Sequence, residues 1–119
     1  MGKPILCVDF DGVLHSYTSG WKGAGVVSDP PVDGAIRWLT KAVKVFDVAI
    51  YSSRSKDPDG IAAMRGWLSD NGLCSCVLNQ LDFPTQKPPA FLTIDDRAVC
   101  FNGKFDSPED LIKFKPWNK

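Results

Sequence analysis

The sequence has almost no histidine, no net charge and no long apolar run. Its 119 residues include one histidine, and 14 basic residues balance 14 acidic ones. Such a balance gives no general attraction to nucleic acid or to an anionic membrane, although it does not exclude a local basic rim. No apolar run approaches the ~18 to 20 residues that cross a bilayer, and the start MGKPILCVDF lacks a secretory pattern. We therefore expect a cytoplasmic protein with no membrane association.

The sequence also lacks a cysteine pattern for zinc. Cys74 and Cys76 are separated by one residue, which is a poor spacing for a zinc knuckle, and His15 is remote from them in the sequence. Cys7 and Cys100 lie in apolar runs, where a free cysteine behaves as a small hydrophobic residue. We predict that all four cysteines are reduced structural thiols.

No internal repeat, low-complexity tract or linker divides the chain, so we predict one domain over residues 1–119. Short apolar runs alternate with helical patterns. The expected strands are 4–10, 47–53, 74–79, 90–95 and 98–103, and the expected helices are 32–46, 57–72 and 107–114. This alternation predicts right-handed crossovers and a mainly parallel sheet. We expect a three-layer, Rossmann-like α/β domain with a five-stranded sheet.

Polar residues lie at or beside the ends of the expected strands, at the edge where ligands bind in parallel α/β sheets. They are Asp9, Asp11, Ser52, Ser53, Lys87, Asp95 and Asp96. Four carboxylates in one crevice would repel one another unless a cation compensates, and Mg²⁺ is the natural partner because it prefers oxygen ligands. Lysine and serine suit a phosphoryl group. The pattern therefore predicts metal-assisted phosphoryl transfer rather than acyl transfer or redox chemistry.

Four motifs, in order, resemble those of the haloacid dehalogenase-like (HAD) hydrolase superfamily. They are VDFDGVL at 8–14, VAIYSS at 48–53, QKPP at 86–89 and TIDD at 93–96. The first motif is fairly specific by itself, and the ordered set is much more specific than any member. The resemblance extends over residues 5–96 and implies a phosphatase, because the dehalogenases of the family lack the second aspartate of the first motif.

The resemblance implies a role for each acidic residue. Asp9 would be the nucleophile that becomes phosphorylated. Asp11 would protonate the leaving group and then activate water. Asp9, Asp95 and the backbone carbonyl of Asp11 would bind Mg²⁺, and Asp96 would support the metal site or join it directly.

The resemblance also implies how the phosphoryl group is held. Ser52 matches the phosphate-binding hydroxyl, assisted by the backbone of Ser53, and Ser53 is the competing assignment for that hydroxyl. Lys87 matches the lysine that steadies the nucleophile and the phosphoryl group. Gly12 would allow the chain to turn sharply after the first strand.

Many family members carry a cap domain over the site, and here both usual insertion positions are short. Residues 12–31, which we call the flap, are glycine-rich and irregular, and residues 54–86 hold only elements that the core needs. We therefore expect no cap domain. An open site would admit a bulky phosphorylated substrate such as a nucleotide, a nucleic-acid end or a protein, or a partner subunit would close it. The oligomeric state is left open.

Aromatic and charged residues near the expected site each have two interpretations. Trp21, in a flap that also contains Tyr17, either stacks a substrate base or anchors the flap, and anchoring is the favoured interpretation. His15 either orients a substrate or neighbouring group or is an ordinary polar loop residue. Arg54 and Arg97 either contact the substrate or pair with local acids.

The sequence thus predicts a Mg²⁺-dependent phosphatase that hydrolyses a phosphomonoester through an aspartyl-phosphate intermediate. The alternative is a non-catalytic binding or regulatory module that keeps the HAD fold. Phosphotransfer to an acceptor other than water is less favoured, because no cap excludes water.

Overall fold

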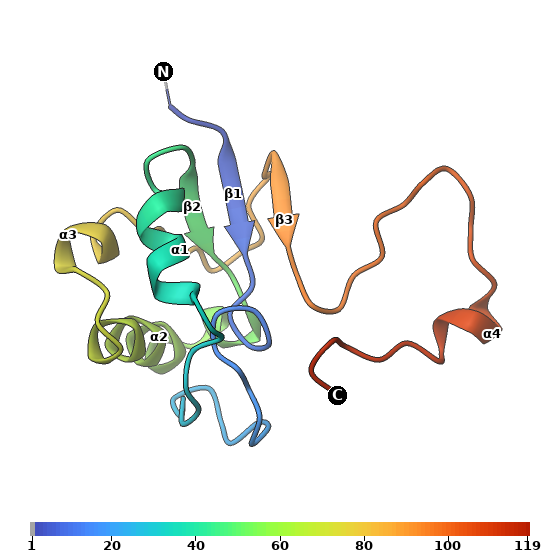
Figure 1. Cartoon of the computed structure of the whole chain (residues 1–119), viewed down its shortest axis with the longest axis horizontal. Helices are drawn as coiled ribbons and strands as arrows, with labels where there is room; N and C mark the ends of the chain where they lie inside the picture. The colour runs from blue at the N-terminus through green and yellow to red at the C-terminus, as the bar shows by residue number, and fades with distance from the viewer. Residues whose placement is uncertain (1) are drawn as a thin grey trace.

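The structure is a computed structural model, and it describes residues 2–119. The elements, in chain order, are β1 (Ile5–Val8), α1 (Ala35–Ala42), β2 (Asp47–Ile50), the 3₁₀ helix η1 (Ser53–Lys56), α2 (Pro58–Asp70), α3 (Ser75–Leu78), β3 (Leu92–Ile94) and α4 (Pro108–Leu111). Figure 1 shows these elements along the chain. The mixed α/β class that the sequence predicts is confirmed.

The sheet has three parallel strands in the order β2-β1-β3. Leu6, Cys7 and Val8 of the central strand are buried, as expected for a continuous apolar run covered on both faces. Asp82 adds one further bridge at the outer edge of β2, where its backbone N–H donates to the Val48 carbonyl over 3.0 Å. All strands therefore end at the same edge of the sheet.

The expected five-stranded sheet is wrong at two places. Residues 74–79 do not form a strand, because Ser75–Leu78 is a helical turn that buries Val77 and Leu78 on one side. A short apolar run is compatible with either a buried strand or a helical segment, and here packing selects the helix. Residues 98–103 form no strand and are exposed, so Cys100 is not a buried thiol.

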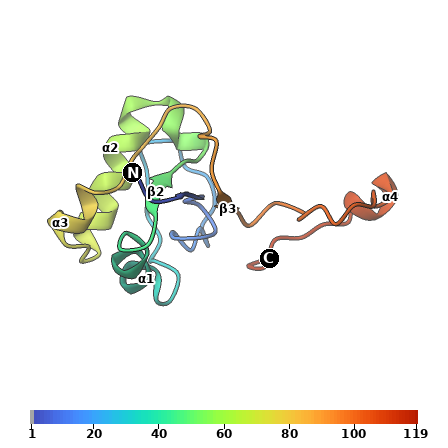
Figure 2. The same cartoon turned by 90° about the horizontal axis from the view of Figure 1, so that it is seen from above.

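Helices lie on both sides of the sheet. Figure 2 shows α1 on one side and α2 on the other. The helix α1 is shorter than the expected 32–46, and it buries Ala35, Leu39 and Ala42. The helix α2 begins as expected, because the Asp57 side chain accepts the Asp59 backbone N–H over 2.9 Å.

Trp38 and Trp67 fall on the apolar stripes of the two longer expected helices, which predicts that both lie in the core, but their burial differs. Trp67 of α2 is buried, and its ring packs edge-on against Phe10 with centroids 5.2 Å apart. Trp38 of α1 is 37% exposed, so its expected place in the core is wrong. Trp38 lines an apolar groove beside β3 that no element of the described chain fills.

Residues 98–116, which we call the arm, extend away from the rest of the molecule. Figures 1 and 2 show this extension in two perpendicular views. The chain returns at its end, where the Trp117 indole N–H donates to the Gly12 carbonyl over 2.7 Å and the Asn118 amide donates to the Ser16 carbonyl over 3.0 Å. The arm is therefore attached at both ends.

None of the helices in residues 2–119 has the length and apolar character that crossing a membrane requires.

Candidate active site

A pocket of about 420 Å³ lies at the carboxyl ends of the three strands. Its lining residues are Asp9, Asp11, Tyr17, Tyr51, Ser52, Ser53, Asp95, Asp96 and Arg97. Six of the seven residues that the sequence places at the strand ends therefore line one pocket; the exception is Lys87.

Strand register explains why Asp9 faces Asp95. In the parallel pairing of β1 with β3, Val8 pairs with Ile94, so the next residues on each strand are these two aspartates. The Asp9 backbone N–H donates to the Ile94 carbonyl over 2.9 Å and extends the pairing to the pocket. Asp95 and Asp96, which follow β3, therefore lie beside Asp9, which follows β1.

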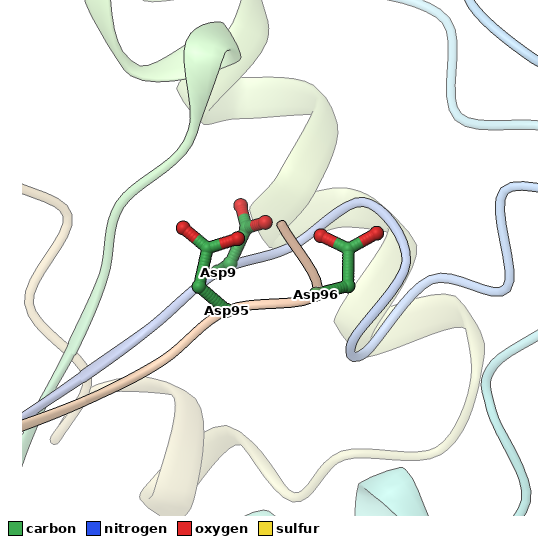
Figure 3. Close-up of side chains that lie close together, drawn as sticks. All are labelled: Asp9, Asp95 and Asp96. Carbon is green, nitrogen blue, oxygen red and sulfur yellow. The ribbon is translucent and has the colours of Figure 1, made fainter. Parts of the chain in front are cut away.

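Three carboxylates form a cluster that could bind a cation. Oxygen atoms of Asp9, Asp95 and Asp96 lie within 4.8 Å of one another. Figure 3 shows these side chains rising from two neighbouring chain segments. The side chain of Asp11, whose backbone carbonyl is the predicted metal ligand, is not part of this cluster.

The cluster raises the pKa of Asp9 from its ordinary value of 3.8 to about 8. Burial is the largest cause, and the charges of Asp95 and Asp96 act in the same direction, whereas the Phe10 backbone N–H opposes them. Without a cation, Asp9 therefore holds a proton at neutral pH. A divalent cation fits this donor set, because it would offset the repulsion and bind hard oxygen ligands.

Asp11 has the opposite environment. The Arg54 Nε donates to Asp11 Oδ2 over 3.0 Å, and the His15 Nδ1 lies 2.8 Å from Asp11 Oδ1. Burial alone would raise the pKa of Asp11, but the hydrogen bonds from His15 and Arg54 hold this pKa below its ordinary value. Asp11 is therefore an anion in this structure.

Arg54 connects Asp11 to the flap. Its guanidinium is fully buried, and Nη1 donates to the carbonyls of Gly23, Ala24 and Val26 over 2.8–3.0 Å. The Trp21 ring stacks on the guanidinium, with the Arg54 Cζ 4.9 Å from the ring centroid. Trp21 thus contacts the arginine that holds the flap, in line with the favoured interpretation as an anchor.

His15 is a buried part of the same network. The Asp29 backbone N–H donates to His15 Nε2 over 3.0 Å, so this ring nitrogen is an acceptor. The proton of the neutral ring then lies on Nδ1 and is donated to Asp11. His15 is therefore not an ordinary exposed loop residue, and it orients the Asp11 carboxylate.

The two serines differ in their surroundings. Ser52 is buried, and its hydroxyl accepts the Arg54 backbone N–H over 3.0 Å while it donates to the Met64 sulfur. Ser53 is exposed. Both line the pocket, so the structure leaves both assignments of the phosphate-binding hydroxyl open, with Ser52 already engaged in capping η1.

The basic side chain that lines the pocket is Arg97, whereas the sequence predicts Lys87. Lys87 is exposed and does not line the pocket, although its charge lowers the pKa of the Cys7 thiol against the larger effect of burial. Arg97 lines the pocket, directly after the acidic pair. Its backbone N–H donates to Asp95 Oδ1 over 2.8 Å.

Two residues in the turn after β1 have a positive φ. Gly12 has φ 83°, and a Cβ atom at this position would overlap the Asp96 carboxylate. Glycine is therefore required here for its conformation and for its small size. Tyr17, which lines the pocket, has φ 61°, a conformation that tyrosine rarely adopts.

The sequence interpretation missed several of these contacts. Asp29 was not identified as a partner of His15, and Trp117 was not placed beside Gly12. Arg54 and Arg97 each follow a polar strand end directly, and this position is the sequence signal that marks both as site candidates. The contacts of Asp29 and Trp117 join distant parts of the chain, and no local pattern marks them.

No protein-family model matches this chain, and no curated protein or solved structure matches it either. The resemblance of the four motifs therefore stays a prediction.

Proposed function

We propose that the protein is a divalent-cation-dependent phosphatase of the HAD type, which hydrolyses a phosphomonoester through a phosphorylated Asp9. The observation that carries the proposal is the cluster of Asp9, Asp95 and Asp96 in a pocket of about 420 Å³. Without a cation, burial and repulsion between the carboxylates make the ionised form of Asp9 unfavourable, as its raised pKa indicates.

Asp9, Asp95 and Asp96 would hold the cation, which we take to be Mg²⁺. When bound, it would supply positive charge for the phosphoryl oxygens and keep the nucleophile ionised. Arg97 and the serines Ser52 and Ser53 are the pocket groups that would bind the remaining phosphoryl oxygens. Lys87 is the residue that the family resemblance implies for binding these phosphoryl oxygens.

Asp9 attacks phosphorus, and the bond to the leaving oxygen breaks as that oxygen takes a proton. In the second step, water attacks the phosphoryl group on Asp9 and loses a proton, while the bond between phosphorus and the Asp9 oxygen breaks and inorganic phosphate leaves. Asp11 lines the pocket and would give the first proton and accept the second. The contacts from Arg54 and His15 favour the ionised form of Asp11, so they favour the second step and oppose the first.

The proposal includes an open site. The chain has no insertion of domain size at either usual cap position, so we propose a Rossmann-like phosphatase without a cap. A bulky phosphomonoester, such as a nucleotide or the phosphorylated end of a macromolecule, is the substrate class that suits an uncovered pocket.

Hydrolysis of p-nitrophenyl phosphate with Mg²⁺ tests the proposal. We expect turnover by the wild-type protein, and we expect Asp9→Asn to reduce kcat by at least about 10³-fold because the nucleophile is lost. Asp70→Asn, at an exposed position on α2, is the matched control and keeps full activity. Full activity in Asp9→Asn would contradict the mechanism.

The alternative, a non-catalytic binding or regulatory module, is favoured by one observation, the engagement of Asp11 by Arg54 and His15. This alternative predicts cation binding without turnover on a panel of nucleotides, sugar phosphates and phosphorylated oligonucleotides. Calorimetric titration with Mg²⁺, run beside the same panel, separates the two functions.

A further inference from the structure

The arm carries many large apolar side chains that residues 2–119 leave exposed. The exposed apolar residues of the arm are Val99, Phe101, Phe105, Leu111, Ile112 and Phe114. Phe105 is 93% exposed and Ile112 is 85% exposed. Val99, Phe101, Phe105 and Leu111 line one hollow of the arm. Contiguous exposed apolar surface is rare on soluble monomers and marks a place where another surface binds.

The accessible surface and the radius of gyration are both larger than expected for a compact monomer of this length. The accessible surface is 7592 Å², which is about 1,200 Å² more than a folded monomer of 119 residues exposes. The radius of gyration is 14.9 Å, against about 13.5 Å for a compact domain of this length. The excess surface exceeds the roughly 800 Å² that each partner contributes to a standard protein interface.

The only helix of the arm is too short to persist without packing. The helix α4 spans Pro108–Leu111, although Ser107 caps it by accepting the Asp110 backbone N–H. Isolated helices shorter than about 12 residues are marginal in water and depend on tertiary contacts. None of the residues of α4 is buried by the described residues 2–119, so this helix has no packing partner among them.

An apolar surface that could receive the arm lies beside β3. A groove of about 380 Å³ runs between the start of α1 and the sheet, and its apolar lining includes Val13, Leu14, Val32, Ala35, Trp38 and Ile94. β3 is an edge strand of the sheet, and Phe91 and Leu92, just before and at its start, are exposed. Unprotected edges of this kind readily pair with another chain.

The arm is attached at both ends and extends away from the sheet of its own chain. Arg97 begins the arm at the pocket, and the Trp117 indole, bound to the Gly12 carbonyl, ends it at the flap. Between these two points the arm extends away from the sheet in both views (Figures 1 and 2). A second copy of the chain offers the same groove and presents the same arm.

We propose that the protein is a symmetric dimer in which the arm of each copy lies in the groove and along the β3 edge of the other copy. The same contact occurs twice in such an arrangement, so one self-complementary surface closes the assembly. Both exposed apolar surfaces are then covered at once. The proposal does not depend on the phosphatase function.

Light scattering coupled to size-exclusion chromatography tests the proposal on the full chain. We expect the wild type to have twice the chain mass at micromolar concentration. The double variant Phe105→Asp and Ile112→Asp removes two apolar contacts and should raise the dimer dissociation constant at least about 100-fold. Val45→Asp is the matched control, because Val45 is 60% exposed on the turn before β2, outside the arm and the groove, and this variant should stay dimeric.

Three results would overturn the proposal: a wild-type monomer at about 100 µM, a dimer that the arm variant leaves intact, or an open series of larger oligomers. Trp38→Lys tests the groove separately and should also give monomers. If Trp38→Lys does not fold by circular dichroism, hydrogen exchange of the wild type decides instead. The amides of residues 98–114 should then lose protection on dilution, and protection independent of concentration contradicts the exchange of arms.

Discussion

The two sides of the pocket shift the pKa values of their carboxylates in opposite directions. On the side of β3, Asp9 lies among other acids, and its pKa is raised to about 8. On the side of the flap, Asp11 lies between Arg54 and His15, and its pKa is held below its ordinary value. The two residues are only two positions apart, so their difference comes entirely from what the fold brings to each. The acid cluster lacks a compensating charge, and the arginine network already contains one.

The largest expected effect comes from breaking the arginine network. Arg54→Met should lower the free energy of unfolding by about 3–5 kcal/mol, because Asp11 and three flap carbonyls would lose a buried partner. Urea denaturation measures this change. Arg37→Met, at an exposed position on α1, is the control and should change stability by less than about 0.5 kcal/mol.

A double variant sharpens this test. Asp11→Asn combined with Arg54→Met removes both charges, so it should be more stable than the sum of the single variants predicts. Strict additivity would mean that the two residues do not stabilise each other, and the contrast between the two sides of the pocket would then be wrong.

The acid cluster should make the free energy of unfolding of the metal-free protein depend on pH. The folded protein keeps a proton on Asp9 up to about pH 8, whereas the unfolded chain releases it near pH 3.9. The folded state therefore binds more protons in this window, and stability of the metal-free protein falls as pH rises from about 5 to 7.5. The slope is at most about 1.4 kcal/mol per pH unit, and partial exposure of the cluster reduces it.

Urea denaturation in EDTA at a series of pH values measures this slope. Asp9→Asn should flatten it, because the titrating group is removed, and excess Mg²⁺ should flatten it for the wild type. A metal-free protein whose stability rises over the same window would contradict the environment assigned to Asp9.

A smaller effect is expected where Gly12 meets the cluster. Gly12→Ala should cost about 1–3 kcal/mol and weaken cation binding, because the new Cβ overlaps the Asp96 carboxylate and φ is positive. Gly20→Ala is a matched control, since Gly20 has φ 80° but open space around its Cβ position. Equal losses in the two variants would show that backbone strain alone, and not Asp96, requires glycine at position 12.

The smallest expected effect concerns which basic side chain, Arg97 or Lys87, binds the phosphoryl group of the substrate. Arg97→Ala should raise KM for an aryl phosphate roughly 5- to 10-fold, because Arg97 lines the pocket but is exposed, so its charged hydrogen bond is worth less than the about 1.5–3 kcal/mol of a shielded one. Lys87→Ala should raise KM less. Steady-state kinetics compares the two variants, and a larger effect at Lys87 would favour the role that the family resemblance implies.

The strand ends could be predicted because each depends on a local pattern. β1 and β2 are continuous apolar runs, and polar residues follow both directly, so the parallel arrangement brings Asp9 and Ser52 to one edge. The cap of α2 at Asp57 could be predicted for the same reason. Residues 74–79 could not, because a six-residue apolar run fits a strand or a helix, and only packing against the core distinguishes them.

Long-range partners could not be predicted. Arg54 follows a polar strand end, which suggested a substrate contact or an ion pair with equal force, and only the fold places Asp11 and the flap carbonyls around its guanidinium. The sequence leaves the role of His15 equally open, and the fold decides it by placing the Asp29 backbone N–H at His15 Nε2. The arm was expected as strand and helix, but its apolar residues find no surface within one chain.

The sequence by itself determined which chemical groups lie at the carboxyl edge of the sheet, because strand ends follow from local apolar patterns and parallel strands end together. Only the tertiary structure decided which of those groups are compensated. Charge compensation depends on distances between residues far apart in the chain, such as Asp11 and Arg54, and on the register that brings Asp9 beside Asp95. The pKa of each carboxylate therefore belongs to the fold and not to the motif.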